Sequence, residues 1–170
     1  MVAILFLHGA GGYADDQGMA DTIRSALDEP VTMPHLRDED MSHAAWSAQI
    51  AAHVGPDVDT VLGHSFGGST FLKMLTETDL GIARLVLLAA PDWGPDGWDV
   101  ADYALLSDTD HRLPPALRID LHHCTDDDVV PVAHLELLSA RMPHAAVVRH
   151  RHGGHQFEGG ALDDVVRTLR

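Results

Sequence analysis

The chain has 170 residues, 45% of them hydrophobic, which predicts one globular domain over residues 1–170 and argues against disorder. Its formal net charge of −15 disfavours nucleic acid and anionic membranes as partners, because both are negatively charged. No apolar stretch reaches the ~20 residues that span a bilayer, and Cys124 is the only cysteine, so we expect a cytoplasmic protein without a disulfide.

Six short apolar runs predict the strands of one sheet. They are uniformly apolar, which is typical of parallel strands that are covered on both faces. Helical patterns lie between them, and repeated strand–helix units predict an α/β fold: a doubly wound, mainly parallel six-stranded sheet with helices on both faces. The strands are expected at 2–7, 31–33, 58–62, 84–89, 117–122 and 145–149, and the helices at about 15–28, 43–54, 67–78, 132–141 and 161–169.

The third apolar run leads directly into Gly63-His64-Ser65-Phe66-Gly67, where the pattern changes from strand to helix. A turn this tight strains the serine backbone and needs small residues two positions away on either side. The strain holds the hydroxyl above the sheet, within reach of a base and a substrate. Ser65 is therefore the candidate nucleophile, and the neighbouring His64 is expected to pack or form hydrogen bonds.

The segment 91–113 is too long for an ordinary connection between a strand and a helix. Because it carries Trp93, Trp98 and Tyr103, we expect an ordered excursion over the carboxyl edge of the sheet. Trp93 and Trp98 could line a substrate pocket or simply pack within the loop. Trp46, on a predicted helix, is expected to be buried against the sheet.

An acid and a histidine follow two later strands. A serine hydroxyl becomes a good nucleophile when an imidazole takes its proton, and a carboxylate fixes the tautomer of that imidazole. Asp126, Asp127 and Asp128 follow the fifth predicted strand, and His155 follows the sixth. The order Ser, Asp, His is that of α/β-hydrolases, whereas trypsin-like and subtilisin-like enzymes have other orders.

On these motifs the whole chain resembles an α/β-hydrolase, and it is most similar to the small serine hydrolases of the retinoblastoma-binding-protein type. The resemblance implies a compact fold with a minimal cap. It also implies that the acid lies four residues before Pro131, which marks Asp127 and leaves Asp126 and Asp128 as alternatives. The retinoblastoma-pocket motif L-x-C-x-E is missing around Cys124, so that partner is not expected. The matching segments are His8-Gly9-Ala10-Gly11-Gly12, Met33-Pro34, Gly63–Gly67, the aspartates before Pro131, and Gly154-His155-Gln156-Phe157.

An oxyanion hole needs backbone N–H groups that point at the developing negative charge. One donor is expected from Phe66, directly after the nucleophile, at the positive end of its helix. The resemblance points to Ala10 as the other donor, with Gly11 as a near alternative, and His8 is expected to shape this loop. The loop lacks the G-x-G-x-x-G and Walker spacings, which disfavours a phosphate cradle.

The chain has 13 histidines, but none of them shows the spacing of a zinc site such as H-E-x-x-H. The close set His150, His152 and His155, and the pair His122-His123, are therefore not interpreted as ligands. We expect neither a metal nor a cofactor.

The sequence thus predicts a serine hydrolase that cleaves a small carboxylic ester or thioester through an acyl-enzyme. The expected partner is a small-molecule acyl substrate; protein partners and the oligomeric state are left open. The alternatives are a non-catalytic binding protein of the same fold, or an acyltransferase that uses the same triad. The predicted site comprises the catalytic Ser65, Asp127 and His155, the oxyanion donors Phe66 and Ala10, and the substrate-binding Gly11, Trp93 and Trp98.

Overall fold

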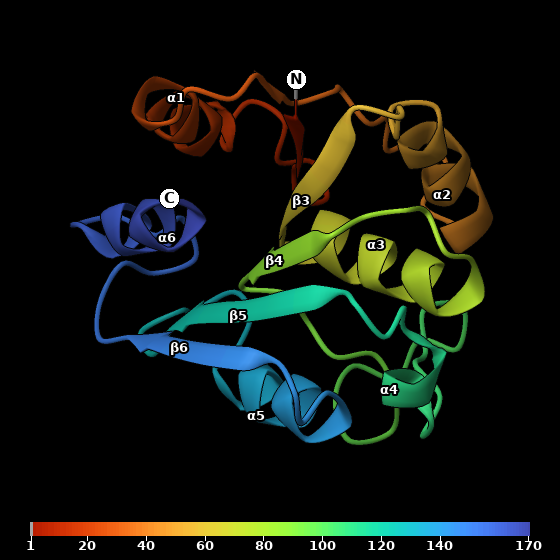
Figure 1. Cartoon of the computed structure of the whole chain (residues 1–170). Helices are drawn as coiled ribbons and strands as arrows, with labels where there is room; N and C mark the ends of the chain where they lie inside the picture. Colours follow the sequence, from red (N-terminus) through yellow and green to blue (C-terminus); the bar gives the residue numbers. More distant parts are fainter. Residues whose placement is uncertain (1) are drawn as a thin grey trace.

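The computed structural model describes residues 2–170, and its centre is one six-stranded sheet (Figure 1). The strand order is β2-β1-β3-β4-β5-β6, and every neighbouring pair is parallel. This confirms the predicted sheet. The strands are β1 (Ala3–Leu7), β2 (Val31–Thr32), β3 (Val58–His64), β4 (Arg84–Leu88), β5 (Arg118–Cys124) and β6 (Ala146–His150).

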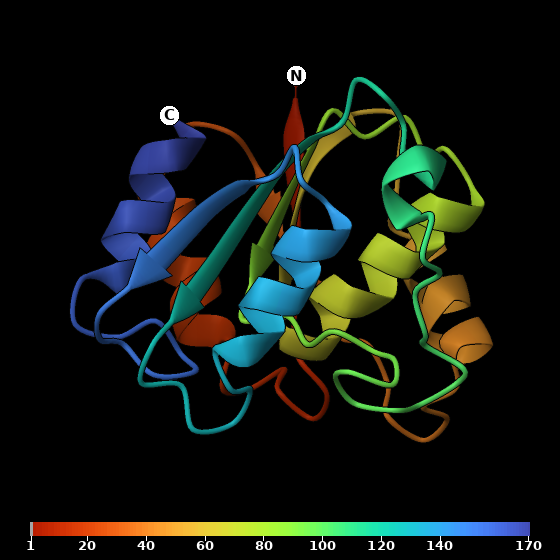
Figure 2. The ribbon, with the colours of Figure 1, turned by 90° about the horizontal axis from the view of Figure 1, so that it is seen from below.

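Helices cover both faces of the sheet, as Figures 1 and 2 show. Helices α1 (Gln17–Ala26) and α6 (Ala161–Leu169) lie on one face. The other face carries α2 (His43–Ala51), α3 (Ser65–Glu77) and α5 (Ala133–Arg141), with the short α4 (Thr109–Arg112) beside α3. The sequence did not predict α4, because four residues are too few to show a helical period. Among residues 2–170, no helix is both long and apolar enough to cross a membrane.

Alternation along the strands divides the apolar side chains between two cores. In β1, Leu5 and Leu7 pack on the α3 side together with Trp46, whereas Ile4 and Phe6 pack on the α1 side. This is the two-residue period of an extended strand. Trp46 is fully buried, which confirms its expected position. The sheet is therefore covered by apolar packing on both faces.

The direction in which the sheet grows changes between β1 and β3. The chain first adds β2 on one side of β1, and then adds β3 and the later strands on the other side. In open parallel sheets, a crevice forms at the carboxyl ends of the strands where the order switches. The loop after β1 and the turn after β3 meet at this point.

The excursion 91–113 is ordered, as predicted, by contacts at its start and in its middle. Asp92 is buried and pairs with Arg141 of α5, with 2.5 Å between Oδ1 and Nε. Farther along, the Tyr103 hydroxyl donates to the Met41 carbonyl at 2.7 Å, and Lys73 Nζ donates to the Ala104 carbonyl at 3.1 Å. The excursion therefore forms a fixed wall beside the carboxyl edge of the sheet.

Candidate active site

Ser65 lies where β3 ends and α3 begins, and its backbone has a φ of 50°. Only small neighbours permit this turn. A Cβ on Gly63 would lie 2.2 Å from Gly68 Cα, and one on Gly67 would lie 2.3 Å from the His8 carbonyl oxygen. The strained turn predicted from the glycine spacing is therefore confirmed.

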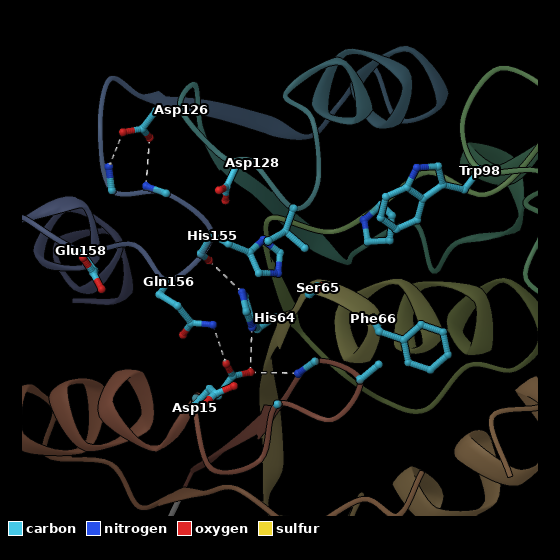
Figure 3. Close-up of a pocket in the computed structure, with 18 of the residues that line it drawn as sticks. Asp15, His64, Ser65, Phe66, Trp98, Asp126, Asp128, His155, Gln156 and Glu158 are labelled. Carbon is cyan, nitrogen blue, oxygen red and sulfur yellow. Dashed lines mark hydrogen bonds and ion pairs between the residues drawn. The ribbon is translucent and has the colours of Figure 1, made fainter. Parts of the chain in front are cut away.

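Ser65 lines a cavity of about 1050 Å³ at the carboxyl edge of the sheet. His155 lines the same cavity (Figure 3). The two sides of this cavity differ in chemistry. Figure 3 shows Phe66 and Trp98 on one side of Ser65, and the acidic residues on the side of His155. The exposed carboxylates that line it are Asp15, Asp126, Asp128 and Glu158, and no lysine or arginine is among the described lining residues.

Asp127 holds the imidazole of His155. The distance between His155 Nδ1 and Asp127 Oδ2 is 2.8 Å, and the Asp127 side chain is completely buried. Its other oxygen, Oδ1, accepts hydrogen bonds from the backbone N–H groups of Val129 and Val130, both at 2.9 Å. Burial by itself would raise the pKa of Asp127, but hydrogen bonds from His123, His155 and Val130 lower it well below its ordinary value. Asp127 is therefore an ionised acceptor for His155 Nδ1–H, which leaves Nε2 of that ring as the proton acceptor.

The two alternative acids lie elsewhere. The Asp126 carboxylate accepts hydrogen bonds from the backbone N–H groups of Gly153 and Gly154, at 3.3 and 2.9 Å. It therefore holds the loop that carries His155 without contacting the ring. Asp128 is exposed at the rim of the cavity. Of the three consecutive aspartates, Asp127 is the one bonded to the His155 imidazole.

Two backbone N–H groups are available beside Ser65. Ala10 and Phe66 both line the cavity, and within the described chain neither N–H group donates a hydrogen bond. The Gly9 carbonyl accepts from His8 Nδ1–H at 2.7 Å and from the Gly12 N–H at 3.0 Å. Because the peptide bond is trans, the Ala10 N–H points away from those two donors. His8 thereby fixes the orientation of the Gly9–Ala10 peptide.

Gly11 has a different environment from its predicted one. Its N–H donates to Asp38 Oδ2 at 3.1 Å, and Gly11 is not among the residues that line the cavity. Gly11 has a φ of 63°, which lies in the left-handed region. Of the two candidate donors, Ala10 lines the cavity with Ser65, and Gly11 does not.

The aromatic side of the cavity is formed by rings that contact one another edge to face. Phe66 contacts Trp93 with 6.0 Å between ring centroids, and Trp93 contacts Trp98 at 5.3 Å. Trp93 is buried, whereas Trp98 is 36% exposed at the mouth. Both tryptophans line the cavity, as do Met41 and Val129, which the sequence did not single out.

A second aspartate beside Ser65 was missed from the sequence. Asp16 precedes α1, yet its side chain does not cap that helix. Its Oδ2 lies 2.7 Å from His64 Nδ1, and both side chains are buried. An aspartate directly before a helix normally caps that helix. Nothing near Asp16 in the sequence indicates that its partner is His64.

The described residues do not contain three or more metal-ligating side chains close enough together to hold a metal ion. The groups at the cavity are one hydroxyl, the imidazoles of His64 and His155, carboxylates and backbone N–H groups. This is the set of groups used in acyl transfer by serine enzymes.

Comparison with known proteins found no matching protein-family model and no matching curated protein. Solved structures do match over nearly the whole chain. A meta-cleavage product hydrolase from Pseudomonas fluorescens IP01 aligns with a TM-score of 0.77 at 14% identity, covering 99% of this chain and 89% of its own. The esterase domain of a Rhodothermus marinus protein gives 0.70 at 15% identity, with coverages of 99% and 84%.

A third similar structure is alpha/beta hydrolase domain-containing protein 10 from mouse, with a TM-score of 0.71 at 12% identity, covering 98% of this chain and 87% of its own. At such identities the likeness shows a shared fold. The narrower similarity to the retinoblastoma-binding-protein type stays a prediction.

Proposed function

We propose that this chain, which has the α/β-hydrolase fold, is a serine hydrolase that cleaves small carboxylic esters or thioesters through an acyl-enzyme. One observation carries the proposal. Ser65, on a strained turn, lines the same cavity as His155, whose Nδ1 is bonded to the buried Asp127. A carboxylate on Nδ1 leaves Nε2 as the basic nitrogen, which is the tautomer that nucleophile activation requires.

In the first half of the reaction, Ser65 Oγ attacks the carbonyl carbon of the substrate while His155 Nε2 takes the hydroxyl proton. The carbonyl π electrons move onto oxygen, and the N–H groups of Ala10 and Phe66 stabilise that charge. The C–O or C–S bond then breaks, and His155 gives its proton to the departing alkoxide or thiolate. The acyl group remains on Ser65.

In the second half, water replaces the alcohol or thiol. His155 takes a proton from the water, whose oxygen attacks the acyl carbon, and the same N–H groups hold the new oxyanion. Collapse of this intermediate breaks the bond to Ser65 Oγ, and His155 returns the proton to it. A carboxylic acid leaves, and the enzyme is regenerated.

The aromatic side of the cavity supports a role for Trp93 and Trp98 in binding the acyl group. Their rings provide apolar surface next to Phe66, which follows the nucleophile. The same triad could pass the acyl group to an alcohol, which would make the protein an acyltransferase. Product analysis with water and an added alcohol in competition separates the two reactions.

The proposal is tested with a panel of p-nitrophenyl esters of increasing acyl length and with a fluorophosphonate probe. We expect turnover and covalent labelling in the wild type and loss of both in Ser65→Ala, because the probe reacts with an activated serine. Ser107→Ala is the matched control, since Ser107 is exposed and outside the cavity. Equal hydrolysis by wild type and Ser65→Ala would rule out the proposal, and a protein that binds esters without turnover or labelling would be a binding protein.

A further inference from the structure

Asp16 and His64 form a second aspartate–histidine pair directly beneath Ser65. The Asp16 side chain is 1% exposed and that of His64 is 2% exposed. Both residues border the cavity, but their side chains are almost fully buried and both nitrogens of the His64 ring are occupied within the protein. His64 Nδ1 lies 2.7 Å from Asp16 Oδ2, and Nε2 lies 2.9 Å from the carbonyl oxygen of His155.

The partners of His64 determine where its protons are. A carbonyl oxygen only accepts hydrogen bonds, so Nε2 must carry a proton. Asp16 Oδ2 also accepts the Gly9 N–H at 2.9 Å, and Oδ1 accepts from Gln156 Nε2 at 3.2 Å. Burial alone would raise the pKa of Asp16, but its bonds to His64, Gly9 and Gln156 lower it. His64 Nε2–H therefore donates to the His155 carbonyl, while Nδ1 lies against the Asp16 carboxylate.

This pair joins three segments that come from different parts of the chain. Asp16 binds the N–H of Gly9, which immediately precedes the oxyanion donor Ala10. His64 precedes the nucleophile and binds the backbone of His155, and Gln156 follows His155. Gly9 also packs against the nucleophile, since a Cβ added to it would lie 3.2 Å from Ser65 Cβ. The relative positions of hydroxyl, base and oxyanion donor therefore all depend on these contacts.

We propose that Asp16 and His64 are positioning residues: a buried, hydrogen-bonded pair that aligns the Gly9–Ala10 peptide and the backbone of His155 with Ser65. This inference rests on the proposed function. The pair itself exchanges no proton with substrate. Misplacing reacting groups by about 1 Å can cost ~10²-fold in rate, and so can losing one oxyanion donor, so the pair is expected to act on kcat.

The experiment compares Asp16→Asn, Asp16→Ala, His64→Gln and the double variant Asp16→Ala/His64→Gln, using p-nitrophenyl acetate. Asp28→Asn and His53→Gln are matched controls at exposed positions away from the cavity. Thermal unfolding checks that each variant is folded. Asp16→Asn keeps an oxygen acceptor for Gly9 but loses the charge and the acceptor for Gln156, and it stays informative if Asp16→Ala does not fold.

We expect kcat to fall about ten- to a hundredfold in Asp16→Ala and His64→Gln, less in Asp16→Asn, with KM changed by less than about threefold. Because the residues act as one unit, the double variant should be no slower than the worse single variant. Amide hydrogen exchange of Gly9, measured in the Ser65→Ala background, should accelerate when Asp16 is removed, whatever the activity.

Folded variants with wild-type kcat, independent losses that multiply in the double variant, or a Gly9 exchange rate that does not change when Asp16 is removed would each overturn the inference. These outcomes leave the proposed function intact. A wild type that neither turns over esters nor reacts with the fluorophosphonate would instead remove the proposed function, and the two failures are therefore distinguishable.

Discussion

Two aspartate–histidine pairs lie beside Ser65, and they differ in what the second imidazole nitrogen touches. In the pair of His155 and Asp127, Nδ1 is bonded and Nε2 is left for the cavity. In the pair of His64 and Asp16, Nε2 is bonded to a backbone carbonyl. A hydrogen bond to a carboxylate is therefore not enough to make a histidine a general base. The ring also needs a free nitrogen on the substrate side.

The largest expected effect comes from removing the free nitrogen. His155→Gln should lower kcat for p-nitrophenyl esters by about 10⁵-fold, because the serine then has no proton acceptor. The matched control is His152→Gln, since the His152 side chain is 87% exposed and should not change kcat. Steady-state kinetics decides, and a loss below tenfold in folded His155→Gln would show that His155 is not the base.

The next largest effect distinguishes the carboxylates of Asp127 and Asp16. Asp127→Asn should reduce kcat by about 10⁴-fold, because an amide favours the wrong tautomer of the catalytic imidazole. Asp16→Asn should lose at least tenfold less, since its histidine transfers no proton. Measuring both variants under identical conditions tests the distinction. Equal losses of kcat would mean that Asp127 and Asp16 have equivalent roles in the reaction.

A third histidine extends the comparison, because it faces another imidazole instead of a carboxylate. His122 Nδ1 lies 3.1 Å from His150 Nε2, and both rings are buried. Burial, helped by the charge of His150, lowers the pKa of His122 to about 4 from 6.5. The unfolded chain therefore binds more protons than the native state between these values, and stability must fall as the pH is lowered through them.

Lowering the pH from 7.5 to 4.5 should thus reduce the free energy of unfolding, with His122 accounting for at most about 3 kcal/mol. Urea unfolding at several pH values measures this slope. His122→Leu should flatten it, whereas the exposed control His53→Gln should not. A variant with the same slope as the wild type would assign the acid sensitivity to other groups.

The smallest effect concerns the carboxylates beyond the pairs. Asp15, Asp126, Asp128 and Glu158 line the cavity without a lysine or arginine among its described lining residues. An ester with a trimethylammonium group should therefore have a kcat/KM about tenfold above that of its uncharged tert-butyl analogue. The ratio should shrink in 0.5 M salt, because exposed charges are screened. If salt does not change the ratio, the preference for the trimethylammonium ester arises from the shape of the cavity and not from its charge.

The fold was predictable because the buried strands are apolar and the glycines around Ser65 leave few backbone alternatives. The helix α3 begins two residues earlier than its apolar pattern suggested, since it starts at Ser65 itself. Asp127 and His155 could be found because each of them follows a predicted strand. Asp16 could not, because it occupies a position where an aspartate normally caps a helix, and its partner lies 48 residues away.

The close packing of the turn around Ser65 limits how this site can change. Gly63, Gly67 and Gly68 already touch one another or the first strand's loop, so any added side chain collides with backbone. Trp98 and Val129, by contrast, are 36% and 54% exposed at the cavity mouth. A mutant library for new acyl specificity should therefore keep the turn invariant and vary Trp98 and Val129. Substitutions at these two positions leave the backbone around Ser65 unchanged.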